Sequence, residues 1–346
     1  MKAQSSRIES CPEVCRDLFI SRAVCIQTER PGELFASRND GMRITMTQNT
    51  SLKDLLAGAQ LPALPQSAIR LLELAQDPEN GPAEFAVPIE ADPGLTGQVL
   101  RFVNSSYFGF SREISNVKLA ITLVGIRTIK NFALWSAVFS LMPNPKSGPF
   151  DLKSLWQDSL RRGLFARAVG KHLGLKDAED LFAAALLQDM AVPLLAKELG
   201  DKYRSLIEGR GEGEARISDL ERETFGWTHA EAGGVIARGW SLPEAFAELI
   251  ESHLDLEEYV AAPEKDPGRV AVALSALLPA TADESWKELE RFQSAYEKVM
   301  KGGPSISETL EKVDADYEEF APVLKLANPS VTLVELYNQS LQKAAT

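Results

Sequence analysis

The stretch from Asp92 to Gly125 limits most strongly what this chain can fold into. Asp92 is a good helix N-cap, and Pro93 suits the first helical position, where its missing N–H leaves no hydrogen bond unmade. A second helix is expected from Ser115, and Gly125 suits the position just after its end. The first helix repeats apolar residues at intervals of four along one stripe: Leu95, Val99 and Val103. This stretch therefore predicts two consecutive amphipathic helices.

Helical periodicity continues from Leu52 into the C-terminal region, and no segment alternates with the period-2 pattern of a strand. Pro82 is expected to start a helix that Pro88 bends or shortens, because a proline inside a helix removes a hydrogen bond. Further helices are expected to start at capping boxes: Thr228–Glu231, Ser241–Glu244 and Ser305–Glu308. The sequence therefore predicts an all-α fold.

Residues 256–346 form a separate run of predicted helices. After Ser305, apolar residues step by four and three, the spacing of a heptad seam: Ile306, Leu310, Val313, Tyr317 and Phe320. This seam is too short to indicate a coiled coil, so we expect it to pack on the chain's own core, with a seam for a partner as the alternative. Trp156 and Trp240 are expected to be core anchors, and His172 a structural residue.

Composition and charge narrow the functional classes. Hydrophobic residues make up 45% and charged residues 25% of the chain, as in an ordinary soluble protein. The net charge of −12 differs from the basic stripe of a nucleic-acid-coating surface, so we expect no nucleic-acid partner. The longest apolar run, from Phe132 to Met142, is too short to span a bilayer and predicts a buried helix instead of a membrane insertion. Charges interrupt the first residues, so no secretory signal is predicted and a cytoplasmic location is expected.

Residues 1–50 lack sustained periodicity, and we expect them to form a flexible tail. Met42 and Met46 precede the patterned region, so we hypothesise that residues 1–45 are not translated in the natural protein. An intact mass that includes Met1 would contradict this hypothesis. All the cysteines lie in the tail: Cys11, Cys15 and Cys25. Their odd number, without a histidine nearby, predicts neither a disulfide framework nor structural zinc.

Several segments of the sequence resemble those of a known family. The segments "DPGLTGQVLRFVNSSYFG" and "ISNVKLAITLVG" resemble the characteristic segment of the HDOD family, the HD-related output domain of bacterial signalling proteins. The resemblance begins near Leu61 in "LPALPQSAIRLLELAQDP" and ends near Asp255 in "WSLPEAFAELIESHLD". It implies an N-terminal helical bundle (52–142) packed on a degenerate HD-like helical bundle (150–255), which together form an HDOD domain (51–255), followed by a C-terminal helical extension (256–346).

Enzymes of the HD superfamily hydrolyse phosphate esters with metals held by histidines and aspartates, including an adjacent His-Asp pair. The matching segment runs from Phe182 to Met190, and Gln188 stands where the family's metal-binding His would be, followed by Asp189. A neutral amide oxygen is a much poorer ligand for first-row metals than imidazole. By the same resemblance, Asp158 falls where a first His is often found, and Ser275 lies near the expected place of a last Asp. The resemblance therefore implies a degenerate site.

Four candidate metal ligands remain: Asp158, Asp189, His229 and His253. A site of mixed oxygen and nitrogen ligands could be built from them, but single residues among them also suit structural roles. Asp189 is expected to cap or bond the loop before Pro193. His229 is expected to be exposed in the first turn of its helix, and His253 lies in a last turn, where the helix dipole favours a cation. We therefore predict no bound metal, no cofactor and no catalysis.

The resemblance implies a non-catalytic signalling scaffold that binds a protein partner. A groove between the two bundles is the expected place for a small ligand or peptide, near these residues: Asn104, Ser105, Asp158, Gln188, Asp189, His229 and His253. For Asn104-Ser105 the alternative is a helix end that uses Asn104 as a left-handed cap. Two other functions remain open: a metal-dependent phosphohydrolase of the HD superfamily, and a sensor that binds a cyclic dinucleotide without cleaving it.

Overall fold

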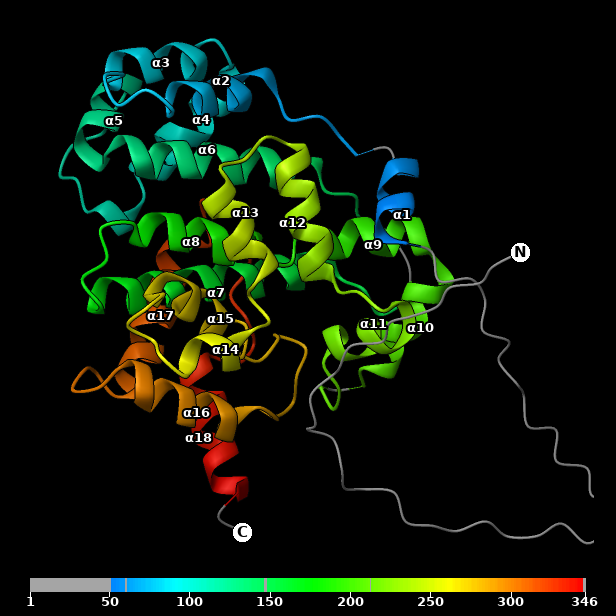
Figure 1. Cartoon of the computed structure of the whole chain (residues 1–346). Helices are drawn as coiled ribbons and strands as arrows, with labels where there is room; N and C mark the ends of the chain where they lie inside the picture. The colour runs from blue at the N-terminus through cyan, green and yellow to red at the C-terminus, as the bar shows by residue number, and fades with distance from the viewer. Residues whose placement is uncertain (1–50, 60, 146–147, 212, 345–346) are drawn as a thin grey trace, which may run out of the picture. The chain divides into compact units, whose positions relative to one another are not determined.

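The computed structural model describes residues 51–59, 61–145, 148–211 and 213–344 (Figure 1). Every regular element in these ranges is a helix, which confirms the predicted all-α fold. The N-terminal elements are α1 (Leu52–Gly58), α2 (Gln66–Leu74), α3 (Pro82–Glu90), α4 (Pro93–Val103), the 3₁₀ helix η1 (Ser106–Phe108), α5 (Val117–Val124) and α6 (Ile126–Leu141). The central helices are α7 (Leu152–His172), α8 (Ala178–Leu187), α9 (Ala191–Leu199), α10 (Asp201–Gly209), α11 (Ile217–Phe225), α12 (His229–Gly239) and α13 (Glu244–Glu251). The C-terminal helices are α14 (Leu256–Val260), α15 (Pro267–Ser275), α16 (Leu289–Val299), α17 (Ile306–Phe320) and α18 (Leu333–Ala344).

The predicted tail at 1–50, with its cysteines and its two internal methionines, lies outside the described residues. The predictions made for it therefore remain predictions. The division of the remaining chain near residues 142–150 and 255 also remains a prediction.

Local capping confirms the predicted start of α4. Asp92 accepts a hydrogen bond from a first-turn backbone N–H at 3.0 Å, and Pro93 stands at the first helical position. α5 is capped by Asn116 instead of Ser115, because the Asn116 carboxamide accepts a first-turn N–H at 2.8 Å. Gly125 ends α5 with a φ of +93°, which glycine adopts without a side-chain clash.

The other predicted caps have mixed outcomes. Thr228 and Ser305 accept hydrogen bonds in capping boxes that start α12 and α17, as predicted. The third predicted box is wrong: α13 begins at Glu244 without a side-chain cap, and Ser241 has a positive φ of 57°. The Glu244 carboxylate instead accepts a hydrogen bond from the Arg238 guanidinium at 2.7 Å on the surface.

Asn104 closes the loop that follows α4. The predicted left-handed cap is wrong, because Asn104 has a φ of −84° and a ψ of 6°. Its Oδ1 accepts from the backbone N of Ile114 and its Nδ2 donates to the backbone O of Ile114, both at 2.7 Å. Ser105 Oγ donates to the carbonyl of Phe102 at 2.7 Å. Both polar side chains therefore stabilise the loop that contains η1.

The long helix α7 lies at the centre of the described fold. It packs against α8, α15 and α17, and Figure 1 shows α7 and α8 between the N-terminal and the C-terminal helices. Phe102 of α4 stacks on Phe132 of α6 with 4.1 Å between ring centroids, and its ring lies 5.4 Å from that of Phe320 in α17. This aromatic contact joins helices from the two ends of the chain in one hydrophobic core.

Several predicted core residues are confirmed. The apolar face of α17 is buried and packs on α7, so the heptad-spaced residues belong to the chain's own core. Trp156 and Trp240 are buried. His172, at the end of α7, is exposed and lies beside Gly303, so its predicted structural role remains a prediction.

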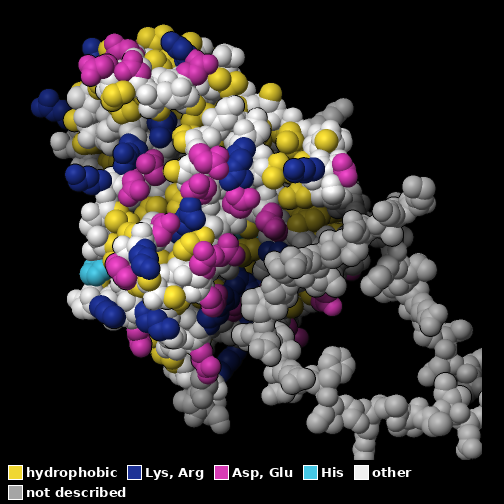
Figure 2. Space-filling model, in the orientation of Figure 1, with side chains coloured by type: hydrophobic (Ala, Val, Ile, Leu, Met, Phe, Trp, Pro, Cys, Tyr) yellow, Lys and Arg dark blue, Asp and Glu magenta, His cyan; other side chains and the backbone are white. Residues whose placement is uncertain are grey.

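None of the helices in the described ranges is long and apolar enough to cross a membrane. Figure 2 shows Lys and Arg interspersed with Asp and Glu over the visible face. The described part of that face therefore carries no continuous basic stripe.

Candidate functional site

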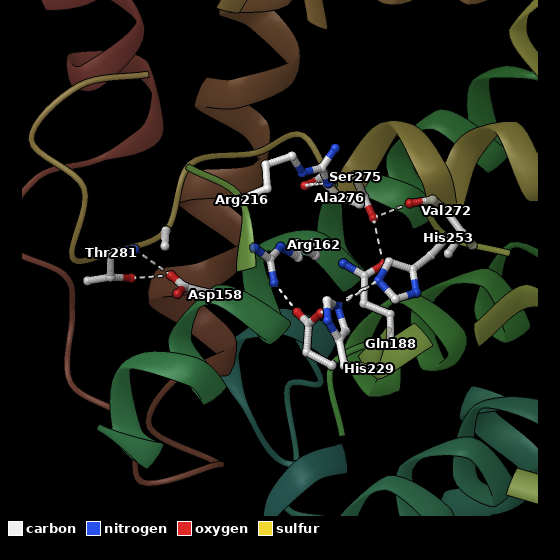
Figure 3. Close-up of polar contacts among 12 residues, drawn as sticks. Asp158, Arg162, Gln188, Arg216, His229, His253, Val272, Ser275, Ala276 and Thr281 are labelled. Atoms are coloured by element: carbon white, nitrogen blue, oxygen red, sulfur yellow. Dashed lines mark hydrogen bonds and ion pairs between the residues drawn. The ribbon is translucent and has the colours of Figure 1, made fainter. Parts of the chain in front are cut away.

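The candidate site forms where the ends of several helices meet beside α7 (Figure 3). Asp158 and Arg162 lie one turn apart on α7. Gln188 directly follows α8, and Asp189 is the next residue. His229 opens α12, His253 follows the end of α13, and Ser275 is the last residue of α15.

Three of the four candidate ligands come together in one buried cluster, Asp189, His229 and His253. Asp189 Oδ1 lies 3.2 Å from His229 Nε2 and 3.7 Å from His253 Nε2, and the two Nε2 atoms are 3.3 Å apart. The predicted exposure of His229 is wrong, because only 3% of the residue is accessible. The capping box at Thr228 starts α12 inside the core, so the first turn of this helix faces other side chains instead of solvent.

Each imidazole is oriented by a hydrogen bond at its other nitrogen. His229 Nδ1 lies 2.7 Å from Glu221 Oε2, and His253 Nδ1 lies 2.6 Å from the carbonyl O of Ile250. Both Nδ1 atoms can therefore donate, and both Nε2 atoms face Asp189. Metal-binding histidines commonly have this second hydrogen bond, because it sets the tautomer and the ring orientation.

Glu221, which was not predicted from the sequence, is fully buried on α11. It accepts hydrogen bonds from the backbone N of His229 at 2.8 Å and from the Tyr203 hydroxyl of α10. A signal was present in the sequence, because Glu221 follows Ile217 by four residues and precedes Phe225 by four, on the apolar stripe of its helix. A carboxylate on such a stripe needs buried partners.

Arg162, also not predicted, binds the other oxygen of the Asp189 carboxylate. Burial disfavours the charge of Arg162, but the carboxylates of Asp189 and Asp158 raise the pKa of Arg162 above its usual value. Burial alone would raise the pKa of Asp189, but Arg162 and the two histidines hold it well below its usual range. Arg162 and Asp189 therefore form a charged pair inside the fold.

The two histidines differ in charge. Burial opposes protonation of both, but the carboxylates of Glu221 and Asp189 raise the pKa of His229 to about 10. Burial lowers the pKa of His253 to about 3, because the attraction of Asp189 does not compensate for the loss of solvent. Near neutral pH, His229 is therefore a cation and His253 a neutral acceptor.

The remaining predicted residues lie beside this cluster, but their side chains hydrogen-bond to other groups. Asp158 Oδ1 accepts hydrogen bonds from Thr281 N at 2.6 Å and Thr281 Oγ1 at 2.5 Å. Burial raises the pKa of Asp158, although Arg162 opposes this effect. Ser275 Oγ lies 3.4 Å from Gln188 Oε1 and donates at 2.6 Å to the carbonyl of Val272.

A pocket of about 240 Å³ opens onto the site. Five of the predicted groove residues line it: Asp158, Gln188, Asp189, His229 and His253. Asn104 and Ser105 are not among its lining residues, because their side chains stabilise the loop after α4. The pocket lies between α7, α10, α11 and the segment that follows α15, so the predicted position between the two bundles is not where these residues meet.

The Asp189, His229 and His253 cluster fits one metal ion. Three ligand atoms separated by 3.2–3.7 Å leave a position about 2 Å from each of them, the usual distance to zinc or a similar ion. The donor set also suits such an ion once His229 gives up the proton on Nε2, since it then joins two neutral imidazoles and a carboxylate. A second ion does not fit in the same way, because Arg162 engages the other Asp189 oxygen and Gln188 offers only a neutral amide.

The described residues form an all-α protein with a buried cluster of polar side chains beside a pocket. The chain belongs to the HDOD family, because the model of the HDOD domain matches residues 61–256, more than half of the chain. This match confirms the resemblance found in the sequence.

Solved structures with the same fold come from several bacteria. An HDOD domain protein of unknown function from Geobacter sulfurreducens is 22% identical, with a TM-score of 0.64 over 81% of this chain and 98% of that one. A Marinobacter aquaeolei VT8 protein whose name proposes signal transduction is 18% identical, with a TM-score of 0.59 over 82% of this chain and 66% of that one. A Shewanella amazonensis SB2B protein whose name proposes a metal-dependent phosphohydrolase is 18% identical, with a TM-score of 0.55 over 79% of this chain and 95% of that one. At these identities the likeness shows the fold alone.

Among curated proteins, an uncharacterized protein of Treponema pallidum is 25% identical over 220 residues. The match covers 62% of this chain and 42% of that protein. The chain therefore spans less than half of the length of this relative.

Proposed function

We propose that this chain is a non-catalytic regulatory protein of a bacterial signalling pathway, which binds a protein partner and holds a small ligand in the pocket beside Asp189. One observation carries this proposal: the Arg162 guanidinium binds one oxygen of the Asp189 carboxylate, in a pocket where Gln188 stands at the position expected for a metal-binding His. A fixed internal cation supplies the positive charge that a metal would otherwise supply.

Hydrolysis of a phosphate ester needs a cation that activates water and offsets charge on the phosphate. Arg162 can offset charge, but it cannot lower the pKa of a bound water as a metal does. Its charge also repels a metal ion held on the other oxygen of the same carboxylate. These effects favour binding over turnover.

A test of this proposal measures metal content and hydrolysis together. The full chain, purified with Zn²⁺, Mn²⁺ or Mg²⁺ supplied, is expected to show no turnover of bis(p-nitrophenyl) phosphate above that of Asp189→Ala. His253→Gln serves as a second variant in case Asp189→Ala does not fold. Asp201→Ala is the matched control, since Asp201 is an exposed carboxylate on α10. Metal-dependent turnover in wild type and Asp201→Ala, lost in the other two variants, would refute the proposal.

The binding of a protein partner is supported by exposed apolar side chains on two neighbouring N-terminal helices, which we call the apolar patch. Val87 of α3 is 67% exposed, and Leu119 and Leu123 of α5 are 45% and 46% exposed. The two helices pack side by side. Exposed apolar side chains that gather on neighbouring helices are typical of protein contacts.

Capture from the native cell tests the partner. A protein held by the wild-type chain should be lost from a Leu119→Lys, Leu123→Lys double variant. It should be retained by Leu341→Lys, which makes the same change at an exposed leucine of α18. Equal capture by all three chains would contradict a role for this patch.

A one-metal phosphohydrolase is the second candidate, and the geometry of the Asp189, His229 and His253 cluster favours it. In that case the three residues would hold the ion, which would supply an activated water, and Glu221 would hold the His229 ring in place. Stoichiometric metal in wild type, absent from Asp189→Ala, together with turnover would support this candidate.

A further inference from the structure

Two buried N–H donors at the pocket lack an acceptor among the described residues. Gln188 is fully buried, and its Nε2 has no hydrogen-bond partner. Arg162 Nε is likewise buried without a partner, although the guanidinium binds Asp189 through Nη1. Both residues line the pocket, and Figure 3 shows the Gln188 amide between Arg162 and His253 in its view. Buried donors are rarely left unpaired, so this arrangement calls for an oxygen acceptor that the chain itself does not supply.

Part of the pocket wall is apolar. Phe150, Leu155, Ile207 and Ile217 line it and are only partly buried, although they pack against the core. Trp286, from the segment after α15, adds a buried aromatic ring to the lining. A molecule with an apolar body would remove these side chains from water.

The arginines that line the pocket are already paired. The Arg162 guanidinium binds Asp189. In the same way, Arg210 binds Asp283 at 2.6 and 2.8 Å, and Arg216 lies 3.3 Å from Glu288. No pocket arginine of the described chain is therefore free to neutralise a phosphate or a carboxylate, and the acidic partners would repel one. Lys287, the other basic residue of the lining, is exposed to solvent, where its charge is screened. This balance favours a neutral ligand.

The size of the pocket limits the ligand further. Its volume of about 240 Å³ lies below the ~300–1,000 Å³ of pockets that enclose drug-sized molecules. A single ring with a short substituent fits within it, whereas a cyclic dinucleotide is too large to be enclosed.

We propose that the pocket binds a small neutral molecule with a carbonyl oxygen and a flat apolar body, such as an aromatic amide or lactam. The carbonyl oxygen accepts from Gln188 Nε2, and its second lone pair can accept a further N–H. The apolar body lies against the walls formed by α7, α10 and α11. This inference rests on the proposed function, because it assigns the ligand of a pocket that binds without turnover.

Three matched probes test the proposal by calorimetry on the full chain. Benzamide carries the neutral carbonyl, benzoate has the same shape with a negative charge, and toluene has the ring without an acceptor. Benzamide is expected to bind with a Kd on the order of 1 mM, as befits so small a molecule. Benzoate and toluene are each expected to bind about tenfold more weakly, because the first meets the pocket acids and the second leaves Gln188 unpaired.

Two variants and one control complete the experiment. Gln188→Leu should weaken benzamide binding about tenfold and leave toluene binding unchanged, because only the donor is lost. Ile207→Trp should abolish binding of both by filling the pocket. Gln66→Leu makes the same Gln-to-Leu change at an exposed position of α2, and this variant should bind all probes as wild type does.

Benzamide binding no tighter than toluene binding would overturn the inference, and it would indicate that water satisfies Gln188. Unchanged benzamide binding by Gln188→Leu, or tighter binding of benzoate, would also overturn it. These outcomes leave the proposed absence of hydrolysis untouched, whereas metal-dependent turnover would refute the proposed function whatever the probes do.

Discussion

The two sides of the Asp189 carboxylate differ in the groups that face them. On one side, Oδ1 faces two imidazoles whose orientation is set by buried partners. On the other side, Oδ2 binds the Arg162 guanidinium. One side therefore offers the donors of a metal site, and the other is held by a guanidinium. A single carboxylate can thus belong to a partial metal site and to a fixed ion pair at once.

Removing the guanidinium should have the largest effect. Arg162→Met leaves the buried Asp189 charge without its main partner, so we expect the free energy of unfolding to fall by about 3 kcal/mol. Urea denaturation measures this loss. Arg70→Met is the control, because Arg70 pairs with Glu73 at an exposed position and should lose less than about 0.5 kcal/mol. Equal losses in the two variants would show that the Arg162 side of the site is not a structural ion pair.

Neutralising Glu221 should have the next largest effect, on the imidazole side. Glu221→Gln removes the charge that accepts hydrogen bonds from His229 and from Tyr203, so we expect a loss of about 2 kcal/mol. Thermal unfolding measures the loss, and the nitrogen resonances of His229 should shift because its Nδ1 partner changes. Glu223→Gln, on the exposed face of the same helix, should do neither. Unshifted resonances would mean that Glu221 does not orient the ring.

Placing an imidazole at position 188 tests directly how the two sides of the Asp189 carboxylate differ. Gln188→His adds a nitrogen ligand where the amide stands, so we expect zinc affinity to rise about tenfold, which is about 1.4 kcal/mol. Calorimetry with Zn²⁺ measures this change. Gln66→His adds a histidine at an exposed position of α2 and should leave the affinity as it was. No gain in Gln188→His would argue that position 188 does not face the cluster.

Substituting Asn104 should have the smallest effect on stability, and it tests whether the loop after α4 is independent of the pocket. Asn104→Ala removes two hydrogen bonds with Ile114, so we expect a loss of about 1 kcal/mol in the free energy of unfolding. Benzamide and zinc binding should remain at wild-type levels, because Asn104 does not line the pocket. Weaker binding of benzamide or zinc by a folded Asn104→Ala variant would indicate that Asn104 contributes to the site.

Much of the fold could be predicted because its causes are local. The starts of α4, α12 and α17 depend on the caps Asp92, Thr228 and Ser305, which act within a few residues of their own helix. The wrong cap at Ser241 shows the limit of this approach. The pattern was present there, but Arg238 competed for the Glu244 carboxylate.

The candidate site was only partly predictable. The family resemblance pointed to Asp158, Gln188 and Asp189, and the structure places all three at one pocket. The exposure of His229 was predicted wrongly because the first turn of a helix is usually near solvent, and only the packing of α12 buries it. Arg162 was missed because no local pattern says which carboxylate a helical arginine will meet.

The amino-acid order alone dictated the helices, most of their ends and the family, since backbone hydrogen bonds, caps and periodicity act over a few residues. Only the packed fold brought the ligand atoms of Asp189, His229 and His253, from separate helix ends, within 4.8 Å of one another. Packing also made Arg162 bind Asp189 and left the buried Nε2 of Gln188 without an acceptor in the described chain. These contacts escaped prediction because burial and charge pairing depend on which helices pack together, and local sequence patterns do not encode that packing.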